Sequence, residues 1–201
     1  MPILKHPAQT SVPIHPLLAE RWSSRAFSDE PVSRDTLLSL FEAARWSPSC
    51  FNEQSWRFIV ATRDTPDAHT QLAGCFTTSN QRWCRAAWVL MLAISMDTFT
   101  VDASPNRMAH YDVGQAVQNL TVQATARGLN VRQAAGIDLA QIRDLYKVPD
   151  TATVLCAVAV GYPGDSDALV PPLNERERQP RTRRPLSELF FADEFGTPFT
   201  G

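Results

Sequence analysis

The hydrophobic positions of the chain form three nearly continuous runs, which predict strands that are buried on both faces. These runs cover residues 58–61, 88–94 and 154–160. A strand with one face in water alternates apolar and polar residues, and these segments do not alternate. The last run is followed by Gly161, Tyr162 and Pro163, and glycine and proline commonly end strands. The pattern therefore predicts a central sheet that is covered on each side.

Segments with helical periodicity lie between these runs. Ser33 can cap a helix that continues through Ala44. A longer helix is predicted over residues 107–127, because its apolar residues recur on one helical face and Gly128 follows as a stop. A further helix is predicted over residues 139–146. Strands that alternate with helices indicate an α/β or α+β layered domain.

The two ends of the chain differ in composition from the middle. Residues 165–201 contain five prolines and a charged stretch, which predicts an extended arm, either disordered or laid across a partner. Residues 1–14 form an N-terminal extension without the apolar core of a signal peptide. The whole length of 201 residues fits one domain. We therefore expect a single domain over residues 1–201, with this extension and arm.

Composition and charge exclude several classes of protein. The formal net charge of -2 argues against a nucleic-acid binder. No run approaches the roughly 20 apolar residues of a membrane span, so the cytoplasm is the expected location. The four cysteines form no C-x-x-C pair and have no histidine at metal-ligand spacing, so neither a metal site nor a disulfide framework is expected. Surface or capping roles are expected for the histidines, which are His6, His15, His69 and His110.

The segment from Arg21 to Arg25 is the first candidate for chemistry. Arginine suits phosphate because its planar fork donates paired, charge-assisted hydrogen bonds. If this segment closes a helix that begins near His15, then Arg21, Ser23 and Arg25 can converge on one anion. The alternative is a solvated basic surface.

Two further segments are candidates. The loop over residues 47–56 contains Asn52, whose amide can donate and accept at once and so suits the edge of a heteroaromatic ring. An ordinary turn between a helix and a strand is the alternative, because serine, proline and asparagine favour turns. Residues 181–184 include three arginines, which either form a solvated charge run or fold back to complete a phosphate site.

Together these segments resemble the nitroreductase family of flavoenzymes. Seven motifs occur in the family's order: R-x-S-x-R at 21–25, P-S-x-x-N-x-Q-x-W at 48–56, D-x-G-x-A-x-Q-N-L at 112–120, G-L at 128–129, G-I-D at 136–138, V-G-Y-P at 160–163 and R-x-R at 181–183. The resemblance implies an α+β (α/β layered) fold with a mixed, mainly antiparallel central sheet flanked by helices. It also implies a homodimer with an extended C-terminal arm.

The resemblance further implies FMN sites at the subunit interface. The residues expected at the ribityl phosphate and at a polar edge of the isoalloxazine ring are Arg21, Ser23 and Arg25, with Arg181 and Arg183 adding charge at the phosphate. Those expected to contact the flavin from the other subunit are Pro48, Ser49, Cys50 and Asn52. Those expected beside the reactive edge are Ala134, Ala135 and Gly136. There a backbone N–H aimed at flavin N5 would stabilise the charge that arrives with hydride.

Three residues depart from the family's pattern. Cys50 stands where serine is common, and Ser55 replaces the usual proline before Trp56. Ala135 stands where some members carry an acidic residue next to N5. A carboxylate there would alter the charge and the water beside the ring, so acceptor preferences are not carried over from those members.

The expected activity is hydride transfer from NAD(P)H through flavin N5 to a small electron-poor acceptor, such as a nitroaromatic or a quinone, by a ping-pong mechanism. No side chain must act as acid, base or nucleophile, so no catalytic residue is assigned. The alternatives are a specialised dehydrogenase or dehalogenase-like reductase of the same fold, a non-enzymatic flavin carrier or regulator, and a domain without flavin. The candidates for the substrate side, each equally plausible as core or interface, are Phe76, Trp83, His110 and Tyr111.

Overall fold

The computed structural model describes residues 7–199 and contains a four-stranded sheet. The strands lie in the order β1-β2-β4-β3, and each neighbouring pair is antiparallel. The mainly antiparallel sheet that the resemblance implied is thus confirmed. The strands are β1 (Trp56–Thr62), β2 (Val89–Met96), β3 (Asn130–Ala134) and β4 (Ala152–Gly161).

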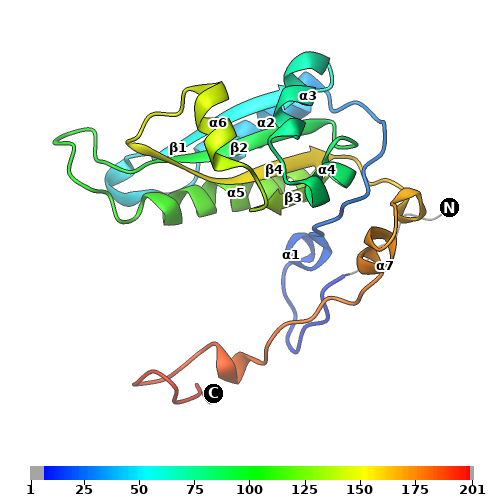
Figure 1. Cartoon of the computed structure of the whole chain (residues 1–201). Helices are drawn as coiled ribbons and strands as arrows, with labels where there is room; N and C mark the ends of the chain where they lie inside the picture. The colour runs from blue at the N-terminus through cyan, green and yellow to red at the C-terminus, as the bar shows by residue number, and fades with distance from the viewer. Residues whose placement is uncertain (1–6, 200–201) are drawn as a thin grey trace.

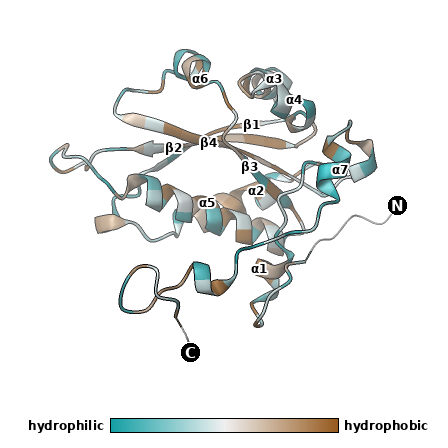
Figure 2. Cartoon of the chain, turned by 60° about the horizontal axis from the view of Figure 1, so that its bottom comes forward, coloured by the Kyte–Doolittle hydropathy of each residue, from teal (hydrophilic) through white to brown (hydrophobic). Residues whose placement is uncertain are grey.

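Helices cover both faces of the sheet (Figures 1 and 2). One face carries α2 and α5, and the other carries α3, α4 and α6. Two short helices, α1 and α7, lie beside the layers near the N- and C-terminal segments. The helices are α1 (Pro16–Glu20), α2 (Arg34–Arg45), α3 (Pro66–Gly74), α4 (Thr78–Cys84), α5 (Ala109–Ala126), α6 (Leu139–Tyr146) and α7 (Leu173–Glu177).

Strand β2 shows why the apolar runs do not alternate with polar residues. Its alternate side chains enter two different cores, because successive residues of a strand point to opposite faces. Leu90 and Leu92 belong to the core beneath α3, α4 and α6, whereas Met91 and Ala93 belong to the core beneath α2 and α5. All four side chains are fully buried. The prediction of a sheet covered on both sides is confirmed.

The predicted elements match the structure within a few residues. Ser33 caps α2 by accepting a hydrogen bond from the Thr36 amide at 3.2 Å. Helix α5 is two residues shorter at its start than predicted and one shorter at its end, and α6 has the predicted bounds. Strand β4 ends at Gly161, as expected. Four helices and strands were not predicted: β3, α3, α4 and α7, of which α7 lies in the segment that was expected to be extended.

The chain after β4 returns to the segment that precedes α2. The Ser28 amide donates to the Tyr162 carbonyl at 3.0 Å, and the Gly164 amide donates to the Ala26 carbonyl at 3.0 Å. A Cβ on Gly164 would lie 2.4 Å from the Phe27 backbone, so only glycine allows this approach. This contact brings α7 back toward residues 22–25.

Beyond α7 the chain runs away from the sheet, past α1, to the C-terminus (Figure 1). This stretch includes a 3₁₀ turn over Leu186–Glu188. Its exposed large apolar side chains are Leu186, Leu189, Phe190, Phe195 and Phe199. Of the predicted extension and arm, residues 1–6 and 200–201 lie outside the described part. No helix among the described residues is long and apolar enough to cross a membrane.

Candidate functional site

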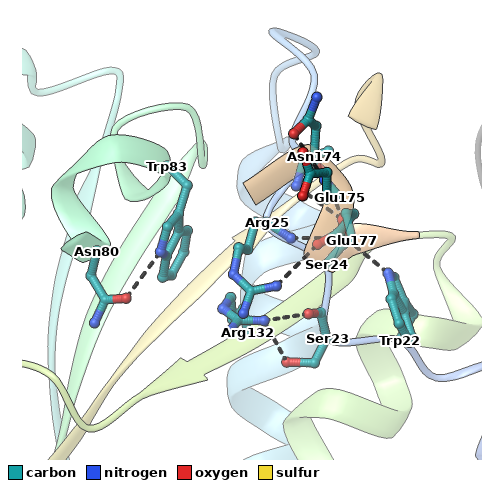
Figure 3. A network of polar contacts seen from close by, with 11 residues as sticks. Trp22, Ser23, Ser24, Arg25, Asn80, Trp83, Arg132, Asn174, Glu175 and Glu177 are labelled. Atoms are coloured by element: carbon teal, nitrogen blue, oxygen red, sulfur yellow. Dashed lines mark hydrogen bonds and ion pairs between the residues drawn. The ribbon is translucent and has the colours of Figure 1, made fainter. Parts of the chain in front are cut away.

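A buried carboxylate organises the segment between α1 and α2 (Figure 3). The side chain of Glu177, in α7, is only 2% exposed. Its Oε1 accepts hydrogen bonds from Trp22 Nε1 and from the Arg25 backbone N–H, both at 3.0 Å. Its Oε2 lies 3.3 Å from Arg25 Nη1 in an ion pair. One carboxylate therefore fixes both the backbone and the guanidinium of Arg25.

These bonds explain why Arg21 to Arg25 do not extend a helix. His15 caps α1 through its Nδ1, which accepts from the Leu17 amide at 3.2 Å, but the helix ends at Glu20. The sequence left open a helix that includes the arginines, and the structure rules it out. The Arg25 N–H is taken by Glu177 and the Ser23 carbonyl by a distant arginine, so neither group is available for a helical ladder.

That distant arginine is Arg132, in β3, which sequence reasoning missed. Its Nη1 donates to the Ser23 carbonyl at 2.6 Å, and its guanidinium lies 5.2 Å from the centre of the Trp83 ring. Burial and then the nearby positive charge of Arg25 lower the pKa of Arg132 to about 10. Its Nε is buried and, within the described residues, has no hydrogen-bond partner.

Three other arginines form a second basic cluster, which consists of Arg21, Arg181 and Arg183. Burial, and then Arg183, lower the pKa of Arg21. Burial, and then Arg21 and Arg183, lower the pKa of Arg181. Arg181 is held by the Ala19 carbonyl at 2.8 Å and by the face of the Trp22 ring at 5.7 Å. Positive charges that repel one another in this way provide a place for an anion.

Gly136 lies in a tight turn after β3. Its carbonyl accepts hydrogen bonds from the Thr77 amide and from Asn80 Nδ2, both at 3.0 Å. A Cβ at this position would lie 2.5 Å from Asn80 Nδ2 and 2.9 Å from Thr77 Oγ1, so a residue larger than glycine would displace these two side chains. Asn80 also accepts from Trp83 Nε1 at 3.0 Å (Figure 3), which connects this turn to the residue beneath Arg132.

The turn leaves two backbone donors available. Within residues 7–199, the N–H groups of Ala135 and Gly136 make no hydrogen bond to the chain. Ala135 is exposed. Such backbone N–H groups can donate to a polar ligand atom without any change in the fold.

The loop with Pro48, Ser49, Cys50 and Asn52 is held in a strained conformation. The Cys50 amide donates to Asp112 Oδ2 at 3.0 Å. Phe51, Asn52 and Gln54 have φ angles of 51°, 58° and 53°, in the left-handed region that non-glycine residues rarely adopt. Strain of this kind gathers at functional sites. The Phe51 side chain is 89% exposed, so the loop is presented to the outside.

This loop does not meet the arginines within one chain. It precedes β1, and β1 and β3 form opposite edges of the sheet. Three strand spacings separate those edges by about 14 Å. The structure therefore brings Arg21, Ser23, Arg25, Arg181 and Arg183 into one region and leaves the loop at the other edge.

The four candidates for the substrate side differ in burial and in the contacts that they make. Phe76 and Trp83 are buried, packed edge to face at 6.1 Å between ring centres. His110 Nε2 lies 3.3 Å from Asp97 Oδ1, and Tyr111 is 62% exposed. His69 is buried and contacts the Ala87 carbonyl, so its expected surface or capping role is wrong.

His15 is the cap of α1, as expected, whereas His6 lies outside the described residues. No group of three or more His, Cys, Asp or Glu residues that could hold a metal occurs in the described part.

The two residues that complete the site were hard to find from sequence. Glu177 lies in a run of mixed charges that is typical of a solvated surface, and Arg132 lies in a strand with polar neighbours. A usable signal was the alternation of Val131 with its neighbours after the Gly128 stop, which predicts a short strand. Ser55, which replaces the usual proline of the family, has a structural contact: its hydroxyl accepts a hydrogen bond from Nδ2 of buried Asn106 at 3.1 Å.

Comparison with known proteins finds similar sequences and structures. The sequence profile described as "Nitroreductase family" matches residues 18–74 and 66–162. A crystal structure of an oxidoreductase containing FMN is 33% identical, covers 94% of this chain and 96% of its own, and superposes with a TM-score of 0.88. A Desulfovibrio desulfuricans protein, described as a nitroreductase in complex with FMN, is 27% identical with a TM-score of 0.70, covering 91% of this chain and 99% of its own.

One curated relative is named for its activity. It is a 4-nitrobenzoate reductase from Pseudomonas putida, 23% identical over 197 residues, which covers 77% of this chain and 86% of the relative. The profile match spans well over half of the chain, and the two structures cover 94% and 91% of it. The chain therefore belongs to the nitroreductase family.

Proposed function

We propose that this protein is an FMN-dependent oxidoreductase that passes hydride from NAD(P)H to small electron-poor acceptors by a ping-pong mechanism. The observation that carries the proposal is the pair of basic centres on either side of Trp22. One is the cluster of Arg21, Arg181 and Arg183. The other contains Arg132, whose buried Nε lacks an acceptor within the described residues. FMN carries a terminal phosphate and a polar ring, so one basic centre can bind the phosphate and the other can face the ring.

The three-arginine cluster fits the phosphate of FMN. A phosphate dianion accepts charge-assisted hydrogen bonds from several guanidinium groups, and their mutual repulsion falls when it binds. Ser23, two residues after Arg21 in the chain, is proposed to add a hydroxyl. Arg25, held by Glu177, can address a polar edge of the ring. In FAD both phosphates belong to a diphosphate bridge, so neither is terminal. The chain also has no G-x-G-x-x-G loop, the motif that commonly binds such a bridge.

The turn after β3 fits the reactive edge of the ring. When bound, FMN accepts a hydride at N5 from the nicotinamide and later passes the electrons to the acceptor. The free N–H groups of Ala135 and Gly136 are backbone donors of the kind that stabilise the resulting negative charge. Gly136 keeps them in place, because a side chain there would displace Asn80. We assign no side chain as acid, base or nucleophile.

We further propose that the functional unit is a homodimer with shared sites. A pocket of about 310 Å³ lies against the β1 edge, between β1 and α2. Its lining is apolar, with Phe41, Trp56 and Phe58, and it includes Arg45 and Arg57.

The C-terminal arm is complementary to this pocket. It exposes apolar side chains, among them Phe190 and Phe195, together with the acidic residues Glu188, Asp193 and Glu194. If the arm of one subunit occupies the pocket of the other, the strained loop with Pro48 to Asn52 lies close to the partner's arginines. In this proposal residues 1–201 form one FMN-binding domain, and residues 1–14 and 165–201 serve the dimer.

The reductase from Pseudomonas putida supports nitroaromatic compounds as acceptors, and quinones share their low-lying acceptor orbital. Relatives named for NAD(P)H use, such as the NADPH-dependent oxidoreductase of Staphylococcus epidermidis, support a nicotinamide donor. We propose the cytoplasm, where both nicotinamides are available, as the location.

Identification of the bound chromophore tests the cofactor. We expect the purified protein to be yellow and to release FMN on denaturation, as shown by chromatography against FMN, FAD and riboflavin standards. Apo-protein should bind FMN at least about a hundredfold more tightly than riboflavin, since each charged hydrogen bond to the phosphate contributes about 1.5–3 kcal/mol. FAD as the main species, or equal affinity for riboflavin and FMN, contradicts the proposal.

A further inference from the structure

The turn after β3 presents hydrogen-bond donors on an accessible surface. Ala135 is exposed, and neither its N–H nor that of Gly136 bonds to the chain within residues 7–199. Exposed Thr77 and Ser79 lie beside the turn: the Thr77 amide donates to the Gly136 carbonyl at 3.0 Å, and the two hydroxyl oxygens are 3.3 Å apart. Only one of the two hydroxyl protons is used between them, so the other remains for a ligand.

The carboxylates nearest to this turn along the chain and in the network of Figure 3 are engaged elsewhere. Asp138 follows Gly136 by two residues, but its side chain caps α6. Its charge acts on buried Cys75, where burial and then Asp138 raise the pKa of the thiol. Glu177 is only 2% exposed and forms an ion pair with Arg25. Neither carboxylate is presented to a molecule that lies at the turn.

The positive charges around the candidate site outnumber these carboxylates. Arg25 and Arg132 lie close enough to repel each other, and they share one carboxylate, Glu177, so one positive charge remains. The three-arginine cluster carries three positive charges, and a phosphate monoester neutralises about two of them. The site therefore stays positive when FMN is bound. A charge acts over several ångströms without contact, so this effect does not require a ligand to reach the buried arginine.

We propose that the protein selects electron-poor acceptors that carry an anionic substituent, such as an aromatic carboxylate or sulfonate. Ala135 is the specificity-determining residue, because its methyl group leaves the donors of the turn without a neighbouring negative charge. A positive surface of this kind raises the rate at which anions associate about tenfold or more at low salt. The inference rests on the proposed function and names the class of acceptor for it.

Two probes of similar shape test the preference. 4-Nitrobenzenesulfonate is an anion, whereas 4-nitrobenzenesulfonamide is neutral at neutral pH. Each is titrated into the oxidised, FMN-loaded protein without a nicotinamide, so that flavin absorbance reports binding and no turnover occurs. We expect the sulfonate to bind about tenfold more tightly at about 0.01 M salt. The difference should largely disappear at about 1 M salt, because the Debye length falls from about 30 Å to about 3 Å.

The kcat/KM values for the same two probes give a second readout. A sulfonate withdraws electrons less strongly than a sulfonamide, so intrinsic reactivity favours the neutral probe. A higher kcat/KM for the sulfonate at low salt therefore has to come from binding.

Three variants assign the preference to the turn. Ala135→Glu adds a negative charge and should lower the ratio of sulfonate to sulfonamide affinity about tenfold. Ala135→Gln has a side chain of the same size without the charge, and its ratio should stay within about threefold of the wild type. Ala86→Glu is the matched charge control, because Ala86 is exposed just beyond the opposite end of α4 from Thr77. Its ratio should equal that of the wild type.

Each outcome decides for or against the inference. A salt-sensitive preference for the sulfonate that only Ala135→Glu removes supports it. Equal or weaker binding of the sulfonate to the wild type overturns it, and so does a glutamate variant with the same ratio as the glutamine variant. If the glutamate variant loses its flavin, the wild-type comparison at the two salt concentrations decides alone. A wild-type protein that binds no FMN, or that reduces neither probe with NADH or NADPH, contradicts the proposed function itself.

Discussion

The arginines of the candidate site make different contacts, although the R-x-S-x-R and R-x-R motifs do not distinguish them. Arg25 is an ion-pair partner of a buried carboxylate, whereas Arg183 is exposed and donates to the carbonyl of the residue before it. A binding role can therefore be separated from a folding role at Arg183 but not at Arg25. The two positions give different predictions for the same substitution.

We predict that Arg183→Ala weakens FMN binding about ten- to a hundredfold and leaves the melting temperature of the apo-protein unchanged, because one charged hydrogen bond to phosphate contributes about 1.5–3 kcal/mol. Fluorescence titration of FMN and thermal melts measure the two quantities. Arg184→Ala, which removes an adjacent exposed arginine, is the control and should bind FMN like the wild type. Unchanged FMN affinity in Arg183→Ala would show that this arginine is merely solvated.

Cys50 is predicted to be a contact, not a nucleophile. The backbone amide of Cys50, which donates to Asp112 at 3.0 Å, fixes its position, and a serine leaves that bond intact. Cys50→Ser should therefore retain bound FMN and turnover with NAD(P)H. Absorbance of the flavin and steady-state rates check this together. Loss of turnover in a variant that still holds FMN would mean that the thiol takes part in the chemistry.

At the scale of elements, helix α7 ties the C-terminal arm to the rest of the molecule. Glu177 is buried, with donors from Trp22 and Arg25, whereas Glu175 of the same helix is exposed. Removal of one member of a buried pair leaves the other uncompensated. We predict that Glu177→Ala destabilises the protein by roughly 2–4 kcal/mol and exposes residues 178–199 to proteolysis. Glu175→Ala is the matched control.

Denaturant melts and limited proteolysis read out this prediction. FMN should protect the arm in the wild type, because the arm provides Arg181 and Arg183 to the phosphate cluster, and coupling between two sites is reciprocal. A Glu177→Ala protein as stable and as resistant as Glu175→Ala would show that α7 does not anchor the arm.

The elements that the sequence predicted are those whose signals are local. The three apolar strands and α2, α5 and α6 follow from hydrophobic runs, a serine cap or a helical stripe. Strand β3 was missed because it lies at an edge and carries polar Asn130, Arg132 and Gln133. The start of α3, with Thr65 before Pro66 and Asp67, did contain a helix signal that was overlooked.

In the candidate site, too, only the local features could be predicted from the sequence. Its arginine motifs are visible along the chain, and the resemblance to a family orders them. The bond from Arg132 to Ser23 spans 109 positions, and that from Trp22 to Glu177 spans 155. Such pairs depend on how β3 and α7 pack, and no local pattern encodes them. Sequence reasoning therefore identified the candidate anion-binding groups but not the groups that hold them in place.

At the scale of the whole molecule, the proposed dimer predicts complementation between two inactive variants. Arg183→Glu repels phosphate, and Ser49→Trp blocks the loop that is proposed to enter the partner's site. In a mixed dimer one site collects both faults and the other has none. Random exchange makes about half of the dimers mixed, so about a quarter of the sites should be intact.

Co-refolding of the two variants should therefore recover about a quarter of the wild-type activity, since two-fold symmetry gives each dimer two equivalent sites. Mass spectrometry confirms that mixed dimers form. Mixed dimers without activity would mean that each site is built within one chain.

The central claim, that this fold holds FMN and uses it to transfer electrons, is tested most directly by an anaerobic titration of the purified protein. Addition of one equivalent of NADH or NADPH should bleach the flavin absorbance, and a nitroaromatic compound or menadione should then restore it. The account predicts this complete cycle with at least one of the two nicotinamides. A bound flavin that neither nicotinamide reduces, while dithionite does, would contradict it and identify a flavin-binding protein without this activity.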